Sequence, residues 1–269
     1  MPIPIVNSIA SWFLKKRFHQ IELFLKYPNE VQNELLLQLI TTAKDTEIGK
    51  QYDFDSITID MQHGLVDYQT ALNMLQVISA SGKTPMVRVP WNEPGIIMKS
   101  LDAGALGIIC PMINTPEDAA NFVSTTKYAP VGSRSSGPTR AIMIHGPNYH
   151  DEANDNIISL AMIETVEALD NVEKIAATEG LTGIYIGPSD LSISMGFKPG
   201  LDRVEPEVIK AIKRIENACI DNNIKVGIHC LSPSYLKDKL SNGYHLATLA
   251  SDVRIYAEGI SNKLKEARA

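Results

Sequence analysis

The sequence has few cysteines, no long apolar run and no excess of basic residues. Its three cysteines, Cys110, Cys219 and Cys230, lack CxxC spacing and are few, so neither a disulfide framework nor a zinc cage is indicated. No apolar run approaches the roughly 18 residues that a membrane span requires. Lys and Arg number 25 against 31 Asp and Glu, a net charge of −6, which argues against nucleic acid or an anionic membrane as the main partner.

The rest of the composition is ordinary for a soluble enzyme or binding protein. The 44% apolar and 21% charged fractions are enough to bury a sizeable core. A length of 269 residues suits one or two domains, and a single (β/α)₈ barrel of about 250 residues would also use it. At the N-terminus, MPIPIVNSIASWFLKKRF has its charges after the apolar stretch, the reverse of a secretory signal. We therefore expect a cytoplasmic protein.

The first 54 residues differ in pattern from the remainder. Aromatic and aliphatic residues recur at helical spacing over 8–26 and again over 29–44, separated by Tyr27-Pro28-Asn29. We predict two amphipathic helices that pack outside the sheet or against another subunit, because so large an apolar face favours association. A homo-oligomer is therefore expected.

From residue 56 onwards, short β-branched runs alternate with helical patterns. The predicted strands are 57–60, 85–89, 107–110, 158–163, 183–186, 225–228 and 246–250. The predicted helices are 66–81, 93–103, 116–127, 167–179, 205–222 and 232–242. Nearly continuous apolar strands joined by helices are typical of a parallel sheet covered on both faces, as in a TIM-type barrel.

The pattern contains seven strands, whereas a closed barrel of this type has eight. The upstream candidate is PIPIV (2–6), whose two prolines remove ladder donors. We therefore expect an α/β TIM-type (β/α)₈ barrel that is incomplete at its first strand and carries an N-terminal helical extension. The long stretch 128–157, rich in Gly and Pro, is interpreted as a functional excursion.

Active sites of βα barrels are built at the carboxyl ends of the strands. Here nearly every strand end carries an ionisable residue: Asp60 and His63 (with Gln62 between them), then Arg88, Glu164, Asp190, His229 and Asp252. Glu164 and Asp190 follow adjacent strands and would suit Mg²⁺ or Mn²⁺, although two ordinary carboxylates at the barrel mouth explain the pattern equally well.

The other strand-end residues also leave alternatives open. Arg88 either pairs with a neighbouring carboxylate or binds an anionic ligand. Asp60 is close enough in sequence to orient the imidazole of His63 as a general base, but DxxH also occurs by chance. For His229 we favour a core or rim histidine. Gly187, Pro188 and Ser189 open a predicted helix and form a reasonable anion cradle.

An ordered series of motifs carries a family resemblance. These are IDMQHG (59–64), VRVPWNEP (87–94), LDAGALGIICPMINTPEDA (101–119), RSSGPTRA (134–141), MIET (162–165) and IYIGPSDLSISMG (184–196). The series covers about four-fifths of the chain with correct spacing. It resembles the HpcH/HpaI family of metal-dependent (class II) 2-oxo-acid aldolases, which is related to the citrate lyase β-chain.

The resemblance implies a role for each matching residue. Glu164 and Asp190 would be ligands of a divalent metal (Mg²⁺, Mn²⁺ or Co²⁺). Arg88 would bind and polarise the 2-oxo acid, and His63, oriented by Asp60, would join the acid–base step. Two departures affect substrate contacts: Gln62 stands where many members have Glu, and Met162 stands where many have Gln.

The N-terminal segment departs further. Residues 11–54 look like the opening helices of auxin-responsive acyl acid–amido synthetases, but none of that family's nucleotide-binding machinery follows. We therefore divide the chain into a helical extension, 1–54, and an aldolase βα barrel, 55–269. The junction near Phe54-Asp55 is either a natural fusion or an assembly artefact.

These observations predict cleavage of a 4-hydroxy-2-oxo acid to pyruvate and an aldehyde, both small-molecule partners. A Schiff-base route is disfavoured because no strand end carries a lysine. Two alternatives remain. One is a C–C lyase acting on an acyl-CoA, as in citrate lyase relatives, although no basic patch for CoA phosphates is evident. The other is a catalytically impaired, truncated or chimeric barrel.

Overall fold

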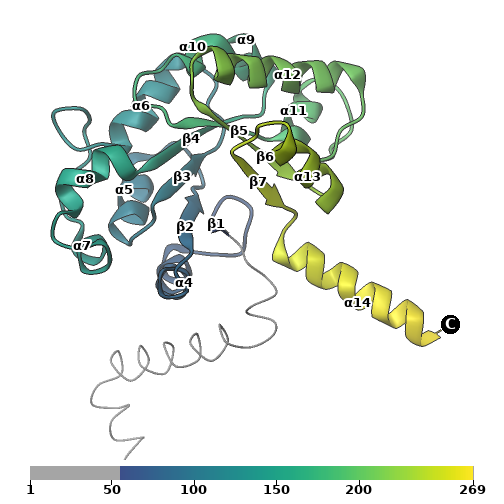
Figure 1. The fold of residues 1–269 in the computed structure, drawn as a ribbon, viewed down its shortest axis with the longest axis horizontal. Helices are drawn as coiled ribbons and strands as arrows, with labels where there is room; N and C mark the ends of the chain where they lie inside the picture. The colour runs from purple at the N-terminus through teal and green to yellow at the C-terminus, as the bar shows by residue number, and fades with distance from the viewer. Residues whose placement is uncertain (1–54, 269) are drawn as a thin grey trace, which may run out of the picture. The chain divides into compact units, whose positions relative to one another are not determined.

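Seven parallel β-strands run in sequential order through residues 55–268, the part of the chain that this computed structural model describes. The strands are β1 (Ser56–Asp60), β2 (Thr84–Arg88), β3 (Gly107–Cys110), β4 (Ile158–Ile163), β5 (Gly183–Ile186), β6 (Lys225–Cys230) and β7 (Leu246–Leu249). Each strand pairs with its neighbours in sequence. The result is a curled α/β sheet, as the periodicity predicted (Figure 1).

Helices connect all these strands. They are α4 (Tyr68–Ala80), α5 (Pro94–Asp102), α6 (Pro116–Thr126), α7 (Thr139–His145), α8 (Tyr149–Asn156), α9 (Val166–Asp170), α10 (Val172–Ala176), α11 (Pro188–Ser194), α12 (Pro206–Asp221) and α13 (Pro233–Ser241), with α14 (Asp252–Arg268) after the last strand. Figure 1 shows α5, α6, α12 and α13 along the outer side of the strands, and these helices pack on β3 to β7.

The chain divides into two units. One comprises Met1–Asp55 and Gln76–Lys83, and the other comprises Ser56–Leu75 and Thr84–Ala269. All seven strands and every residue of the candidate site belong to the second unit. The sheet and the site are therefore parts of one compact unit.

Proline and side-chain caps mark where many of the helices in this unit begin. Five helices begin with proline at the first turn, where a missing N–H costs nothing: Pro94, Pro116, Pro188, Pro206 and Pro233. Thr115 caps α6 through a reciprocal capping box with Asp118. The Glu93 carboxylate caps α5 by accepting the N–H groups of Gly95 and Ile96. These two caps fix where the loops after β2 and β3 end.

The interior face of the sheet holds an apolar cluster. It contains Met86, Ile109, Leu160, Met162 and Tyr185, each at most 3% exposed. Because side chains alternate along a strand, Arg88 follows Met86 on the interior face and Glu164 follows Met162 just beyond β4. The cluster therefore forms the floor beneath the strand ends.

The predicted strands are confirmed, and three helical details differ from expectation. The helix expected over 167–179 is broken into α9 and α10 at Asn171, whose side chain donates to the carbonyl oxygens of Asn114 and Glu167. The excursion 128–157 contains α7 and α8. The C-terminal helix α14 is not among the predicted helices, and all of its residues are exposed.

The same excursion is anchored by a buried arginine. The Arg134 side chain is fully buried and donates to Asp102 Oδ1 at 2.8 Å and to the Tyr149 hydroxyl at 3.1 Å. Its guanidinium also lies 4.4 Å from the ring centroid of Tyr128. The ion pair with Asp102 joins the loop to the end of α5.

An eighth strand is not seen within residues 55–268, and in that range the outer edges of β1 and β7 have no strand partner. The candidate strand 2–6, the predicted helices over 8–44 and the proposed extension 1–54 lie outside the described residues, so these remain predictions. None of the helices in the described range is both long and apolar enough to cross a lipid bilayer.

Candidate functional site

The carboxyl ends of the strands bring most of the predicted site residues to one edge of the sheet. Asp60 ends β1, Arg88 ends β2, and Glu164 directly follows β4. Asp190 lies in the first turn of α11, after β5. This convergence follows from the parallel topology, in which every strand ends on the same side.

Arg88 and Asp60 form a bidentate ion pair between neighbouring strands. Arg88 Nε donates to Asp60 Oδ1 at 2.9 Å, and a terminal nitrogen donates to Oδ2 at 2.6 Å. Burial alone would raise the pKa of Asp60, but the hydrogen bond and charge of Arg88 outweigh it and hold the pKa below its ordinary value. The pair is therefore ionised, and the remaining guanidinium N–H groups are available to an anionic ligand.

The Asp60 carboxylate also organises the loop after β1. Its Oδ1 accepts the backbone N–H groups of Gln62 at 3.0 Å and His63 at 3.3 Å. The sequence predicts that Asp60 orients the His63 imidazole. In the structure, the hydrogen bond between these two residues comes from the His63 backbone, and the His63 side chain is exposed. The acid–base role of His63 stays a prediction.

Glu164 is a buried carboxylate that forms no salt bridge within the described residues. Its side chain is 2% exposed, and Oε1 accepts the Met112 N–H at 2.8 Å. Met112 has φ of 55°, an uncommon conformation for a non-glycine residue, found more often at functional sites. Burial, reinforced by the charge of Asp190, raises the pKa of Glu164 to about 7, although the Met112 N–H and Arg88 oppose this.

Glu164 and Asp190 form a donor set suited to a hard divalent cation. The charge of Asp190 acts on Glu164, and carboxylate oxygens are the ligand type that Mg²⁺ and Mn²⁺ prefer. The described residues contain no cluster of three or more His, Cys, Asp or Glu side chains placed to hold a metal. Two carboxylates nevertheless fit Mg²⁺, which keeps several of its waters when it binds to protein.

The backbone at Gly187 approaches the Glu164 carboxylate closely. A Cβ at Gly187 would lie 2.9 Å from Glu164 Oε2 and 2.5 Å from the terminal methyl of Met162. Of the three residues expected to cradle an anion, Gly187 donates its N–H to the Ile163 carbonyl and Pro188 has no N–H. Ser189 is therefore the one whose backbone can donate to a ligand.

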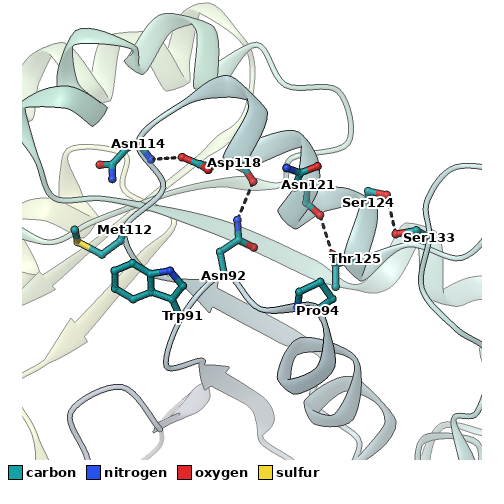
Figure 2. Close-up of a pocket in the computed structure, with 10 residues that line it drawn as sticks. All are labelled: Trp91, Asn92, Pro94, Met112, Asn114, Asp118, Asn121, Ser124, Thr125 and Ser133. Atoms are coloured by element: carbon teal, nitrogen blue, oxygen red, sulfur yellow. Dashed lines mark hydrogen bonds between the residues drawn. The ribbon is translucent and has the colours of Figure 1, made fainter.

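A pocket of about 470 Å³ opens along α6 (Figure 2). Trp91 and Asn92 line it from the loop after β2, and Met112 and Asn114 from the loop after β3. Trp91 is 57% exposed. Met112 links the pocket to the Glu164 carboxylate, because its backbone N–H donates to Glu164 while its side chain lines the pocket. Sequence reasoning did not find this pocket.

Comparison with known proteins supports the resemblance. A family model described as HpcH/HpaI aldolase/citrate lyase matches residues 39–258. This chain belongs to the HpcH/HpaI aldolase/citrate lyase family. The matched range begins upstream of residue 55, where we placed a domain boundary, and that boundary stays a prediction.

Curated relatives within the HpcH/HpaI family are similar over most of the chain. A hydroxypyruvate/pyruvate aldolase of Rhizorhabdus wittichii is 39% identical over 217 residues, 81% of this chain and 86% of the relative. A 5-keto-4-deoxy-D-glucarate aldolase of Escherichia fergusonii is 34% identical, covering 80% and 84%. A crystal structure of a family protein from Burkholderia cenocepacia J2315 matches with a TM-score of 0.75 at 28% identity, covering 88% of this chain and 91% of the other.

One polar cluster in this HpcH/HpaI chain was missed by sequence reasoning. The Tyr185 hydroxyl, the Thr248 hydroxyl and His229 Nδ1 are hydrogen-bonded to one another across β5, β6 and β7. The sequence favours a core or rim position for His229, and its side chain is partly buried near the rim. The strand-end rule located His229, but nothing in the sequence pairs it with Tyr185 or Thr248.

Proposed function

We propose that this chain is a divalent-metal-dependent aldolase that cleaves 4-hydroxy-2-oxo acids to pyruvate, or a close analogue, and an aldehyde. The observation that carries the proposal is the convergence of two metal-type carboxylates, Glu164 and Asp190, with the partly free guanidinium of Arg88 at one sheet edge. The relatives named as pyruvate and keto-deoxy-glucarate aldolases support the same reaction class.

Glu164 and Asp190 are the residues that would hold the cation. When bound there, Mg²⁺, Mn²⁺ or Co²⁺ supplies positive charge beside the oxygens of the 2-oxo acid. Gly187 contributes by leaving room, because any side chain there would displace the Glu164 carboxylate. The Met112 N–H holds the same carboxylate in place through Oε1.

Arg88 stabilises the charge that develops during cleavage. As the C3–C4 bond breaks, its electron pair moves toward the 2-oxo oxygen, where fixed hydrogen-bond donors lower the barrier. Asp60 holds one edge of the guanidinium through two of its nitrogens, so the remaining N–H groups are pre-oriented and need little reorganisation.

His63 accepts the proton of the C4 hydroxyl in this proposal. Its exposed ring lies on the loop after β1, and Asp60 fixes that loop by accepting two backbone N–H groups. The Asp60 carboxylate thus accepts from the backbone N–H of His63 and from the side chain of Arg88. Loss of the hydroxyl proton converts C4 to the aldehyde carbon, and the electron pair of the C3–C4 bond becomes part of the enolate of pyruvate. Uptake of one proton at C3 then gives pyruvate and balances the step.

The test is metal-dependent release of pyruvate, followed with a coupled lactate dehydrogenase assay. EDTA should abolish cleavage, and Mn²⁺, Co²⁺ or Mg²⁺ should restore it. Asp190→Asn should weaken Mn²⁺ binding, whereas Asp151→Asn, a matched change of an exposed carboxylate on α8, should not. Full cleavage activity in a metal-free, chelated sample would overturn the proposal.

A further inference from the structure

The hydrogen bonds of Tyr185, His229 and Thr248 join three neighbouring strands at the rim of the interior face. His229 Nδ1 lies 2.7 Å from Thr248 Oγ1 and 3.3 Å from the Tyr185 hydroxyl, which also bonds Thr248 directly. Tyr185 reaches this far because Gly227 intervenes on β6. A Cβ at Gly227 would lie 3.1 Å from Tyr185 Cδ2, so the ring rests against bare backbone.

The protons of the cluster can be assigned by counting donors and acceptors. Tyr185 is 2% exposed, and its O–H must donate to Thr248 or His229. Two arrangements satisfy both hydroxyl protons: Tyr185 donates to Thr248 Oγ1 and Thr248 to His229 Nδ1, or Thr248 donates to the Tyr185 oxygen and Tyr185 to Nδ1. Nδ1 is then an acceptor, so the ring proton of a neutral His229 resides on Nε2.

Burial and the charges around His229 together favour its neutral form. Burial and the positive charge of Arg88 lower the pKa of His229 to about 4, and Arg254 acts in the same direction. Asp60 and Asp202 oppose this shift and are outweighed. Within residues 55–268, Nε2 has no hydrogen-bond partner, and the side chain is partly exposed at the strand ends. An N–H donor without a partner in this range thus lies at the rim, within electrostatic reach of Arg88.

We propose that His229 is a substrate-contacting residue, whose Nε2–H donates a hydrogen bond to an oxygen of the aldehyde-derived part of the substrate. This inference rests on the proposed function. Arg88, Glu164 and Asp190 take the 2-oxo acid end, and they lie at the ends of β2 and β4 and after β5. The ends of β6 and β7 are therefore left for the remainder of the molecule. Tyr185 and Thr248 act as positioning residues that fix the tautomer.

The tautomer is tested without measuring activity. In uniformly ¹⁵N-histidine-labelled full-length protein, long-range ¹H–¹⁵N correlation spectra distinguish a protonated ring nitrogen from an unprotonated one. The His229 signals are assigned as those missing from His229→Gln. We expect Nε2 to be protonated and Nδ1 unprotonated at pH 7, and Thr248→Val to allow the opposite tautomer. A wild-type His229 protonated on Nδ1 would overturn the proposal.

The substrate contact is tested by comparing two reactions of each variant. His229→Leu should lower kcat/KM for cleavage about tenfold, the usual effect of losing one neutral hydrogen bond, and more than it lowers exchange of pyruvate methyl protons in D₂O. His229→Gln, which keeps an N–H donor, should recover most of the loss. His245→Leu, on the opposite end of β7, is the matched control and should retain wild-type kcat/KM.

The outcomes separate this inference from the proposed function. If wild-type protein neither cleaves 4-hydroxy-2-oxo acids nor exchanges pyruvate protons with Mn²⁺ present, the proposed function fails. If wild-type protein does both and folded His229→Leu has an unchanged kcat/KM, the proposed function stands and the role of His229 is refuted.

Discussion

The buried carboxyl of Glu164 makes a quantitative prediction about stability and pH. Its pKa rises from an ordinary value of 4.5 to about 7 in the folded protein, chiefly through burial. A carboxyl whose folded pKa is raised binds its proton more tightly when folded. Glu164 therefore destabilises the fold least below about pH 4.5. This destabilisation grows as the pH rises to about 7 and is constant above that.

The magnitude follows from the size of the shift. At about 1.4 kcal/mol per pKa unit, ionised Glu164 destabilises the metal-free fold by about 3 kcal/mol above pH 7 and by about 1 kcal/mol or less at pH 5. Glu164→Gln removes the charge and keeps an oxygen to accept the Met112 N–H. The variant should be more stable than wild type by about 3 kcal/mol at pH 8, with most of the gain lost at pH 5.

The assay is urea unfolding followed by circular dichroism at pH 5 and pH 8, with EDTA in every sample. Glu207→Gln, at an exposed position in the first turn of α12, is the matched control and should show little difference between the two pH values. An equal effect of Glu164→Gln at both pH values would refute the argument, because the carboxyl would then be charged, or neutral, at both.

Three further predictions concern the other anchors of the site and loop. Arg88→Ala should lower kcat by about 10²-fold, with poor rescue by Lys, and a normal kcat with a lowered Tm would show a purely structural ion pair. Gly187→Ala should weaken Mn²⁺ binding, measured by calorimetry, about tenfold or more. The control Gly259→Ala, with nothing near its new Cβ, should raise stability by up to about 1 kcal/mol, and equal Mn²⁺ affinity in both variants would contradict the prediction. Arg134→Met should lower the free energy of unfolding by about 3 kcal/mol, because it removes one partner of a buried ion pair. Arg214→Met, in the exposed pair with Glu173, should lower it by less than about 1 kcal/mol, and similar losses in the two variants would show that burial of Arg134 is unimportant.

The strands could be predicted because their signal is local. Runs such as GIIC and GIYI are short, apolar and β-branched, and they form β3 and β5 where expected. The break at Asn171 could not be predicted, and the Asn171 side chain there donates to the carbonyl oxygen of Asn114 in a distant loop. Local periodicity contains no information about such a contact.

The site shows the same division. The strand-end rule alone predicted that Arg88 and Glu164 lie near each other, and in the structure Arg88 ends β2 and Glu164 directly follows β4. Whether Arg88 pairs with a carboxylate depends on which residue of β1 lies opposite it, and the sequence left that open. The contacts of Tyr185 required the close approach at Gly227, which only the three-dimensional arrangement of β5, β6 and β7 reveals.

The register of β1 against β2 has a consequence for how the chain assembles. Asp60 lies opposite Arg88 only in the observed alignment, and sliding β1 by one residue would place Ile59 there and turn Asp60 to the other face. The part-buried guanidinium would then lose its partner, at a cost of a few kcal/mol. The Asp60–Arg88 ion pair thus also selects the register of β1 against β2. A chain in which β1 is shifted by one residue is less stable, and its Arg88 lacks the carboxylate that orients the guanidinium.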